Sequence, residues 1–373
     1  MIYANKEEKD ILMAIYTYRT LTVNMVAQYV LKRPIQEVRA ILERMERSNW
    51  IEYNNDSDKE NYFIKTGGIN QIRHLLQEDP LQANKIKVKP RFLNHQLHLN
   101  EFVLQFFNQN EWVKTHEAVS YQDELRVNEK RYNNFRPDGL LQLGNTEVLL
   151  EMDMGTERSS AIRKKMERYF RFNEKAMLEG RKVLILFICH KTHTPYMLGQ
   201  IHKAVASTLN VFHPDFDLIV GDYEKLLHYL KTEATATLTS SIEVYRQQTL
   251  ETYQSHFPAC LVKDVFNDKI SQTYFDYQIA PARTNFKNYL VIDLKYLRFS
   301  RLKTWHYCSY WLSAYQKKIK NYETMGILVL YQKRDEELVK LLQPDVVSNE
   351  AKNKVITKSH EHFKKLLPTL STK

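Results

Sequence analysis

The first 64 residues carry three helical patterns of hydrophobic positions, followed by two short strand patterns. Apolar residues three or four apart mark helices over about 11–16, 25–30 and 35–45, and Pro34 suits the first turn of the third. Residues 50–53 and 62–64 alternate as strands on either side of a polar tip. Three helices followed by a two-stranded wing predict a winged helix-turn-helix domain over residues 1–80.

The third predicted helix carries polar residues suited to reading DNA. In winged helix-turn-helix proteins this helix enters the major groove, where Gln and Arg side chains contact base edges. The predicted DNA-binding residues are Gln36, Arg39 and Arg44 on the helix and Lys59 on the wing. Three glutamates on the same helix oppose DNA binding, because they repel the phosphate backbone: Glu37, Glu43 and Glu46. A module that mediates dimerisation or contacts protein is therefore the alternative.

From residue 93 the pattern changes to mixed helices and strands. We expect helices over 93–106, 158–178 and 195–208, and strands over 112–121, 134–143, 146–153, 182–189 and 216–220. The run 182–189 is apolar almost throughout, which is typical of a strand buried on both faces. The basic stretch 85–91 separates the two patterns, either as a solvated linker or as a phosphate contact. The pattern predicts an α/β domain over residues 90–235.

The last third, 240–373, predicts a further α/β region. A strand over 289–294, a helix over 304–320 and a strand over 326–331 repeat the order seen over 147–188. This order fits a degenerate second copy of the preceding domain or an ordinary βαβ unit. Aromatic and basic residues are interleaved over 296–315, a composition that suits single-stranded DNA or core packing.

Composition narrows the class of protein. Lys and Arg exceed Asp and Glu by 54 to 44, giving a net charge of +10 that favours polyanions such as DNA. No apolar run is long enough to span a bilayer, and the three cysteines are widely separated, so we expect a cytoplasmic protein without a disulfide framework.

Three carboxylates form the main chemical signal. Asp138 follows Arg136 and Pro137, and Glu151 and Asp153 share one face of a strand because they are two positions apart. A turn at Gly144 can bring the strand that follows Asp138 beside the strand that carries Glu151. Three neighbouring carboxylates need a cation, and Mg²⁺ or Mn²⁺ prefers oxygen ligands. The sequence therefore predicts a catalytic metal site with these three ligands, against the alternative of a structural turn and an exposed edge.

The helix over 158–178 supplies two more candidates. Lys165 and Tyr169 are four positions apart and lie on one helical face. A lysine that leans over the carboxylates would stabilise charge on a scissile phosphate, and the tyrosine would orient it. The alternative is an exposed basic helix face.

The motif order resembles a known family. An RPD motif, twelve residues, then ExD-x-GTE and a Lys-x3-Tyr helix, all after a winged helix, resembles the replication-relaxation family of plasmid proteins over residues 8–230. The resemblance implies a relation to MobC-type relaxases and a PD-(D/E)XK restriction-endonuclease-like core. It also implies Glu101 as a further metal-side carboxylate, and a homodimer and replication or mobilisation proteins as protein partners. PD-(D/E)XK nucleases usually have Lys at the position that Asp153 occupies here, so the chain departs from the nuclease pattern at this residue.

Three functions remain open at this stage. The first is a metal-dependent nuclease that nicks plasmid or mobile-element DNA at an origin. The second is a non-catalytic initiator or accessory factor on a degenerate nuclease fold, and the third is a transcription regulator. The missing lysine favours the second, and the three carboxylates favour the first. The histidine pairs at 95 and 98 and at 190 and 193 lack the spacing of His-hydrophobe-His relaxases, and no ATP-binding loop occurs.

Overall fold

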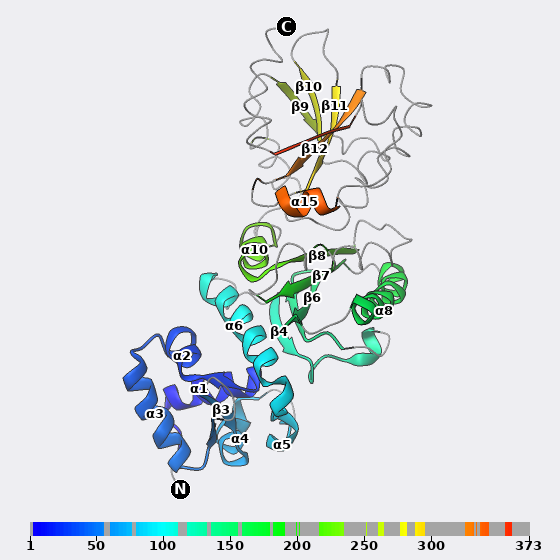
Figure 1. Cartoon of the computed structure of the whole chain (residues 1–373). Helices are drawn as coiled ribbons and strands as arrows, with labels where there is room; N and C mark the ends of the chain where they lie inside the picture. Colours follow the sequence, from blue (N-terminus) through cyan, green and yellow to red (C-terminus); the bar gives the residue numbers. More distant parts are fainter. Residues whose placement is uncertain are drawn as a thin grey trace. The chain divides into compact units, whose positions relative to one another are not determined.

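The computed structural model divides the chain into two compact units. The first contains Met1–Gln142 and Leu149–Met154, and the second contains Leu143–Val148 and Gly155–Lys373 (Figure 1). The structure describes residues 3–55, 60–76, 80–110, 118–132, 136–155, 159–179, 182–190, 199, 201, 216–234, 251, 260–264, 277–281, 288–294, 325–331, 333, 336–342 and 355–359. Both units contain helices and strands, and the described strands form three sheets, so the expected mixed α+β class is confirmed.

The first unit begins with the helices and hairpin that the sequence predicts. Together with β1, α4 and η2, which the pattern did not predict, the elements are α1 (Lys6–Tyr18), β1 (Leu21–Thr22), α2 (Val23–Met25), η1 (Val26–Leu31), α3 (Ile35–Arg47), β2 (Ile51–Asn54), β3 (Asn61–Ile64), α4 (Thr66–Ile72) and η2 (Arg73–Leu75). Thr22 caps α2, and Asn5 and Glu8 form a capping box at the start of α1. The strands pair antiparallel in the order β1-β3-β2. We call residues 3–76 the N-terminal module.

The basic stretch after this module is packed against it. It contains α5 (Ala83–Ile86) and η3 (Pro90–Phe92) and leads into α6 (Leu93–Gln109). Ile86, Val88, Leu93 and Leu97 are buried in the same hydrophobic core as α1, α3 and β3. The stretch therefore completes the core of the N-terminal module and is held in place by it.

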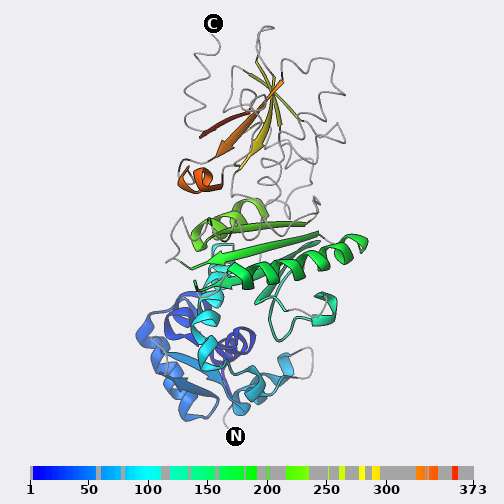
Figure 2. The same ribbon diagram turned by 45° about the vertical axis from the view of Figure 1, so that its right-hand side comes forward.

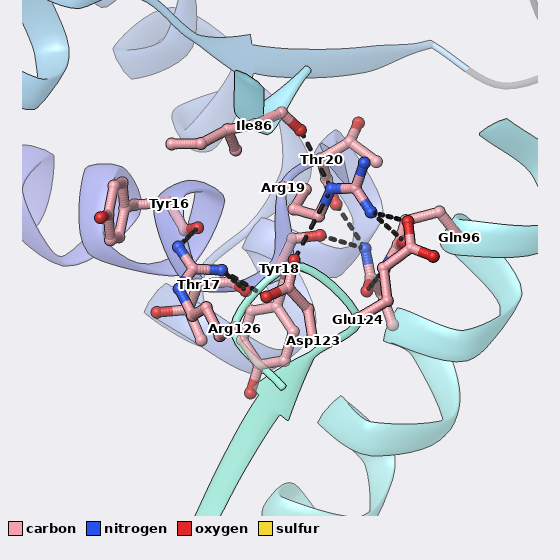
Figure 3. Close-up of polar contacts among 11 residues, drawn as sticks. Tyr16, Thr17, Tyr18, Arg19, Thr20, Ile86, Gln96, Asp123, Glu124 and Arg126 are labelled. Carbon is pink, nitrogen blue, oxygen red and sulfur yellow. Dashed lines mark hydrogen bonds and ion pairs between the residues drawn. The ribbon is translucent and has the colours of Figure 1, made fainter. Parts of the chain in front are cut away.

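A buried polar junction joins the module to α6 and β4 (Val119–Asp123) (Figure 3). The Arg19 side chain donates to the Ile86 carbonyl and to Gln96, and its Nε lies 3.6 Å from Asp123 Oδ2. Asn100, also on α6, donates to the carbonyls of Tyr18 and Thr20. The end of α1 is thereby tied to both elements inside the first unit.

The remaining elements build two five-stranded sheets. They are η4 (Glu129–Tyr132), β5 (Gly139–Leu143), β6 (Thr146–Asp153), α8 (Ser159–Leu178), β7 (Lys182–Cys189), β8 (Phe216–Asp222), α10 (Tyr223–Tyr229), η5 (Leu230–Ala234), β9 (Cys260–Asp264), β10 (Tyr277–Pro281), β11 (Asn288–Asp293), β12 (Met325–Tyr331), α15 (Glu336–Leu342) and β13 (Val355–Ser359). The strand orders are β4-β5-β6-β7-β8 and β13-β12-β11-β10-β9. In the second unit, α8 and α10 lie on opposite faces of the parallel pair β7 and β8 (Figures 1 and 2).

Some expected elements differ from the observed ones or fall outside the described residues. The strand expected over 134–143 begins only at Gly139, because Pro137 and Asp138 form the turn that enters it. The helices expected over 195–208 and 304–320 fall outside the described residues, apart from two single positions, 199 and 201. The aromatic stretch 296–315 lies outside them as well. In the parts of the chain that the structure describes, every helix is too short or too polar to cross a membrane.

Candidate functional site

Asp138 lies where the chain enters β5 and is bonded to the next strand. Its Oδ2 atom accepts a hydrogen bond of 2.8 Å from the backbone N–H of Met152 in β6. Pro137 precedes it and is buried, which favours an extended entry into the strand. This hydrogen bond connects the RPD segment to β6.

Glu151 and Asp153 lie in the last residues of β6. Their side chains are only 1% and 2% exposed, and alternation along a strand puts both on one face. Buried carboxylates are costly unless something compensates the charge. The ExD motif thus lies buried at the end of a strand, and Met152, between its two carboxylates, supplies the amide that binds Asp138.

His95 is the residue that sequence reasoning did not place at this site. Its Nε2 atom lies 3.1 Å from Asp138 Oδ2 and 3.0 Å from the Met152 carbonyl oxygen. Burial lowers the pKa of His95, but the hydrogen bond and charge of Asp138, the Met152 carbonyl and the charge of Glu151 outweigh it and raise the pKa. Because Nε2 lies between a carboxylate and a carbonyl oxygen, the geometry favours a proton on this nitrogen, donated into the carboxylate site.

The carboxylates as arranged do not fit the predicted divalent ion. The Oδ2 atom of Asp138 is engaged by His95 and by the Met152 amide. Within the described part of the chain, no three His, Cys, Asp or Glu side chains are grouped closely enough to hold a metal. Glu101, expected as an extra ligand, is half-buried on α6 and makes no hydrogen bond or ion pair with another described residue.

Lys165 and Tyr169 belong to the second unit, whereas the three carboxylates belong to the first. The Nζ atom of Lys165 lies 6.0 Å from the centre of the Phe187 ring in β7, a cation–π arrangement. Tyr169 is completely buried on α8. Lys165 therefore packs against β7, an element of its own unit.

The predicted DNA-binding residues on α3 differ in their surroundings. Gln36 is exposed. Arg39 is exposed and pairs with Glu60 at 3.0 Å, across from α3 to the start of β3. Arg44 pairs at 2.8 Å with Glu8, a buried residue of the α1 capping box. Lys59 lies outside the described residues.

Comparison with known protein families gives a match to one family model. Residues 12–185 match the Replication-relaxation family model. The match starts in α1 and ends in β7, so it includes α3, His95 and all three carboxylates. The C-terminal sheet lies beyond it.

Two further comparisons complete the result. Among solved structures, the small subunit of the heterodimeric restriction endonuclease R.BspD6I is similar with a TM-score of 0.23 and 12% identity. The alignment covers 40% of this chain and 74% of that one. No curated protein sequence matches the chain.

Proposed function

We propose that this protein binds DNA at an origin in the replication or mobilisation of a plasmid or other mobile element. The observation that carries the proposal is the Replication-relaxation match over residues 12–185, which joins the N-terminal module and the carboxylate site in one family segment. The net charge of +10 supports a polyanionic partner. Double-stranded DNA is thus the primary ligand, with a homodimer and other replication or mobilisation proteins as further partners.

In this proposal the N-terminal module is a winged helix-turn-helix with α3 as its reading helix. The Arg39–Glu60 pair supports this role, because both side chains are more than 40% exposed and such pairs contribute at most about 1 kcal/mol. DNA can therefore replace Glu60 as the partner of Arg39 at little cost. Arg44 stays a proposed DNA contact, and it also pairs with Glu8, a buried residue that caps α1.

Metal-dependent nicking is the second candidate, with Mg²⁺ or Mn²⁺ as cofactor. The specific observation in its favour is the burial of Glu151 and Asp153 on one face of β6. Lys165 and Tyr169 remain proposed as auxiliary residues. Because Asp138 is engaged by His95, this candidate requires a rearrangement of the carboxylates before an ion can bind, and a binding protein on the same fold requires none.

Binding is tested by footprinting and fluorescence anisotropy on the element's own origin. Arg39→Gln should weaken origin binding by about 5-fold to about 100-fold, the worth of one good base contact of about 1–3 kcal/mol. The matched control is Arg47→Gln, an exposed arginine near the end of the same helix whose ion-pair partner is Glu43. Equal affinity of wild type and Arg39→Gln would exclude α3 as the reading helix.

Nicking is tested separately on supercoiled origin plasmid with magnesium or manganese. If the second candidate holds, Glu151→Gln should abolish nicked product and retain binding. Glu147→Gln is the matched control, because Glu147 is also a buried glutamate of β6. A wild-type protein that binds the origin but never nicks it would leave the binding function alone.

A further inference from the structure

The cations of the protein differ in whether a carboxylate already neutralises them. Arg33, Arg39, Arg44 and Arg47, on or just before α3, each form an ion pair with a glutamate of the N-terminal module. Together with Glu37, Glu43 and Glu46, these pairs leave little net charge on α3. Much of the affinity for a phosphate backbone must then come from another surface.

Such a surface lies immediately after the module. Residues 80–100 contain no Asp or Glu, while Lys85, Lys87, Lys89 and Arg91 follow one another at every second position. All four are exposed. Lys87 pairs with Glu52, whereas Lys85, Lys89 and Arg91 have no carboxylate partner among the residues that the structure describes. We call Lys85–Phe92 the basic ridge.

The ridge is fixed by the core beneath it. Ile86 and Val88 alternate with the lysines and are 1% and 3% exposed, and Leu93 anchors the far end. The Arg19 side chain also donates to the Ile86 carbonyl. The cations therefore project from a backbone that is already ordered, so little backbone entropy is lost when they bind a ligand.

An exposed aromatic ring stands at the end of the ridge. The Phe92 side chain is 49% exposed, and the Arg91 guanidinium lies 4.6 Å from its ring centre. Leaving a phenylalanine in water is unfavourable. A planar partner that covers the ring would remove that cost, and the stacked arginine adds a cation beside it.

We propose that the basic ridge is a binding site for single-stranded DNA, separate from α3. Phosphates pair with Lys85, Lys89 and Arg91, and one unpaired base stacks on Phe92. A single strand fits better than a duplex because the base faces of a duplex are already covered by their neighbours, whereas an unpaired base offers a free face. In both views of the chain, α5 lies on the side of the module away from α3, so a duplex on α3 leaves the ridge accessible (Figures 1 and 2).

This inference rests on the proposed function at an origin, where strands are separated, but its test does not depend on nicking. The full-length protein is titrated into a labelled 20-nucleotide oligo-dT and, separately, into origin duplex, with anisotropy as the readout. The ridge variant combines Lys85→Gln, Lys89→Gln and Arg91→Gln. The matched control removes three exposed cations of α8, with Arg163→Gln, Lys164→Gln and Arg168→Gln.

The ridge variant should bind oligo-dT more weakly and with a shallower salt dependence. Each lost phosphate contact changes the slope of log affinity against log salt by about 0.7, so three contacts change it by about 2. The α8 variant should keep the wild-type slope. Phe92→Ala should weaken oligo-dT binding by about 5-fold to about 100-fold, because stacking contributes about 1–3 kcal/mol per base, and Phe92→Tyr should restore it. Unchanged thermal melting of each variant shows that the fold is intact.

The outcomes separate the inference from the proposed function. Wild-type protein that binds origin duplex but not oligo-dT overturns the ridge proposal and leaves the proposed function standing. Equal weakening by the ridge and α8 variants, or efficient competition by polyglutamate, reveals only a general charge effect and also overturns it. If the ridge variant loses duplex and single-strand binding equally while Phe92→Ala changes neither, the ridge is a duplex phosphate contact. Protein that binds no DNA at all fails the proposed function itself.

Discussion

At the scale of single residues, Asp123 shows how burial and ion pairing compete. Its side chain is completely buried, with Oδ1 accepting from Arg126 at 2.7 Å and Oδ2 lying beyond hydrogen-bonding distance of Arg19. Burial raises the pKa of Asp123, and the charges of Arg126 and Arg19 and the hydrogen bond from Arg126 lower it by less. The net direction is upward, so the folded protein holds a proton on Asp123 at pH values where the unfolded chain has lost it.

This shift predicts how stability depends on pH. Because the folded pKa lies above the unfolded value of about 3.9, the stabilising contribution is complete below that value and is lost as pH rises through the folded pKa. The free energy of unfolding of wild type should therefore fall relative to that of Asp123→Asn as pH rises from 4 to 7 in urea titrations. A rise of wild type relative to the variant over the same range would mean that the two arginines dominate the pKa.

Residue-scale contacts were also the least predictable from sequence. The residue pattern placed Glu151 and Asp153 correctly in one strand because strand alternation is a local property. His95 was rejected as part of a different metal motif, and its contact with Asp138 spans 43 residues along the chain. Arg44 remains a predicted DNA contact, and its pairing with Glu8, 36 residues away, could not be read from the helical pattern. Helical periodicity gives the face of a side chain and cannot give the partner on another element.

At the scale of elements, α4 depends on a glycine. A Cβ atom placed on Gly68 would lie 2.3 Å from the Trp50 carbonyl oxygen and 2.8 Å from Leu12 Cδ2. The first of these contacts is with backbone, which cannot rotate away. The first turn of α4 can therefore approach residue 50 this closely only because residue 68 lacks a side chain.

Gly68→Ala should destabilise the N-terminal module. Overpacking costs about 1–3 kcal/mol, which exceeds the gain of about 1 kcal/mol in helix propensity. The urea midpoint should fall, with an unchanged dependence on denaturant. Asn70→Ala, at an exposed position of the same helix, is the control and should leave the midpoint almost unchanged. A Gly68→Ala midpoint equal to wild type would show that α4 can shift away from β2.

Elements with strong periodicity were predicted well, and turns were not. The expected helix over 158–178 and strand over 182–189 agree with α8 and β7 to within one residue at each end. The strand expected from residue 134 was too long at its start, because Pro137 has no N–H and Asp138 uses its side chain to bind the Met152 amide. A side-chain hydrogen bond to a distant strand leaves no periodic signal.

At the scale of the whole chain, the boundary placed between residues 80 and 90 remains a prediction, but the packing across it is clear. Sequence composition suggested a boundary because the stretch is basic and contains a proline. The buried positions between those charges could be recognised only from three-dimensional contacts. Ile86, Val88, Leu93 and Leu97 fill the core of the N-terminal module, and Arg19 ties the same region to α6 and β4.

This packing predicts where the chain can be cut. A fragment ending at residue 80 lacks four buried side chains, each of which contributes at most about 1.5–3 kcal/mol, and their sum is comparable to the total stability of a small domain. The 1–80 fragment should show little cooperative unfolding in urea by far-ultraviolet circular dichroism. A 1–110 fragment, which keeps these side chains, should unfold cooperatively.

Within it, Ile86→Ala should cost about 2–5 kcal/mol. Lys85→Ala, one position earlier, should leave stability almost unchanged, because its side chain is exposed. Equal stability of the two fragments would contradict the assignment of the ridge to this core, and loss of DNA binding in a 1–80 fragment could then be attributed to the missing cations instead of to unfolding.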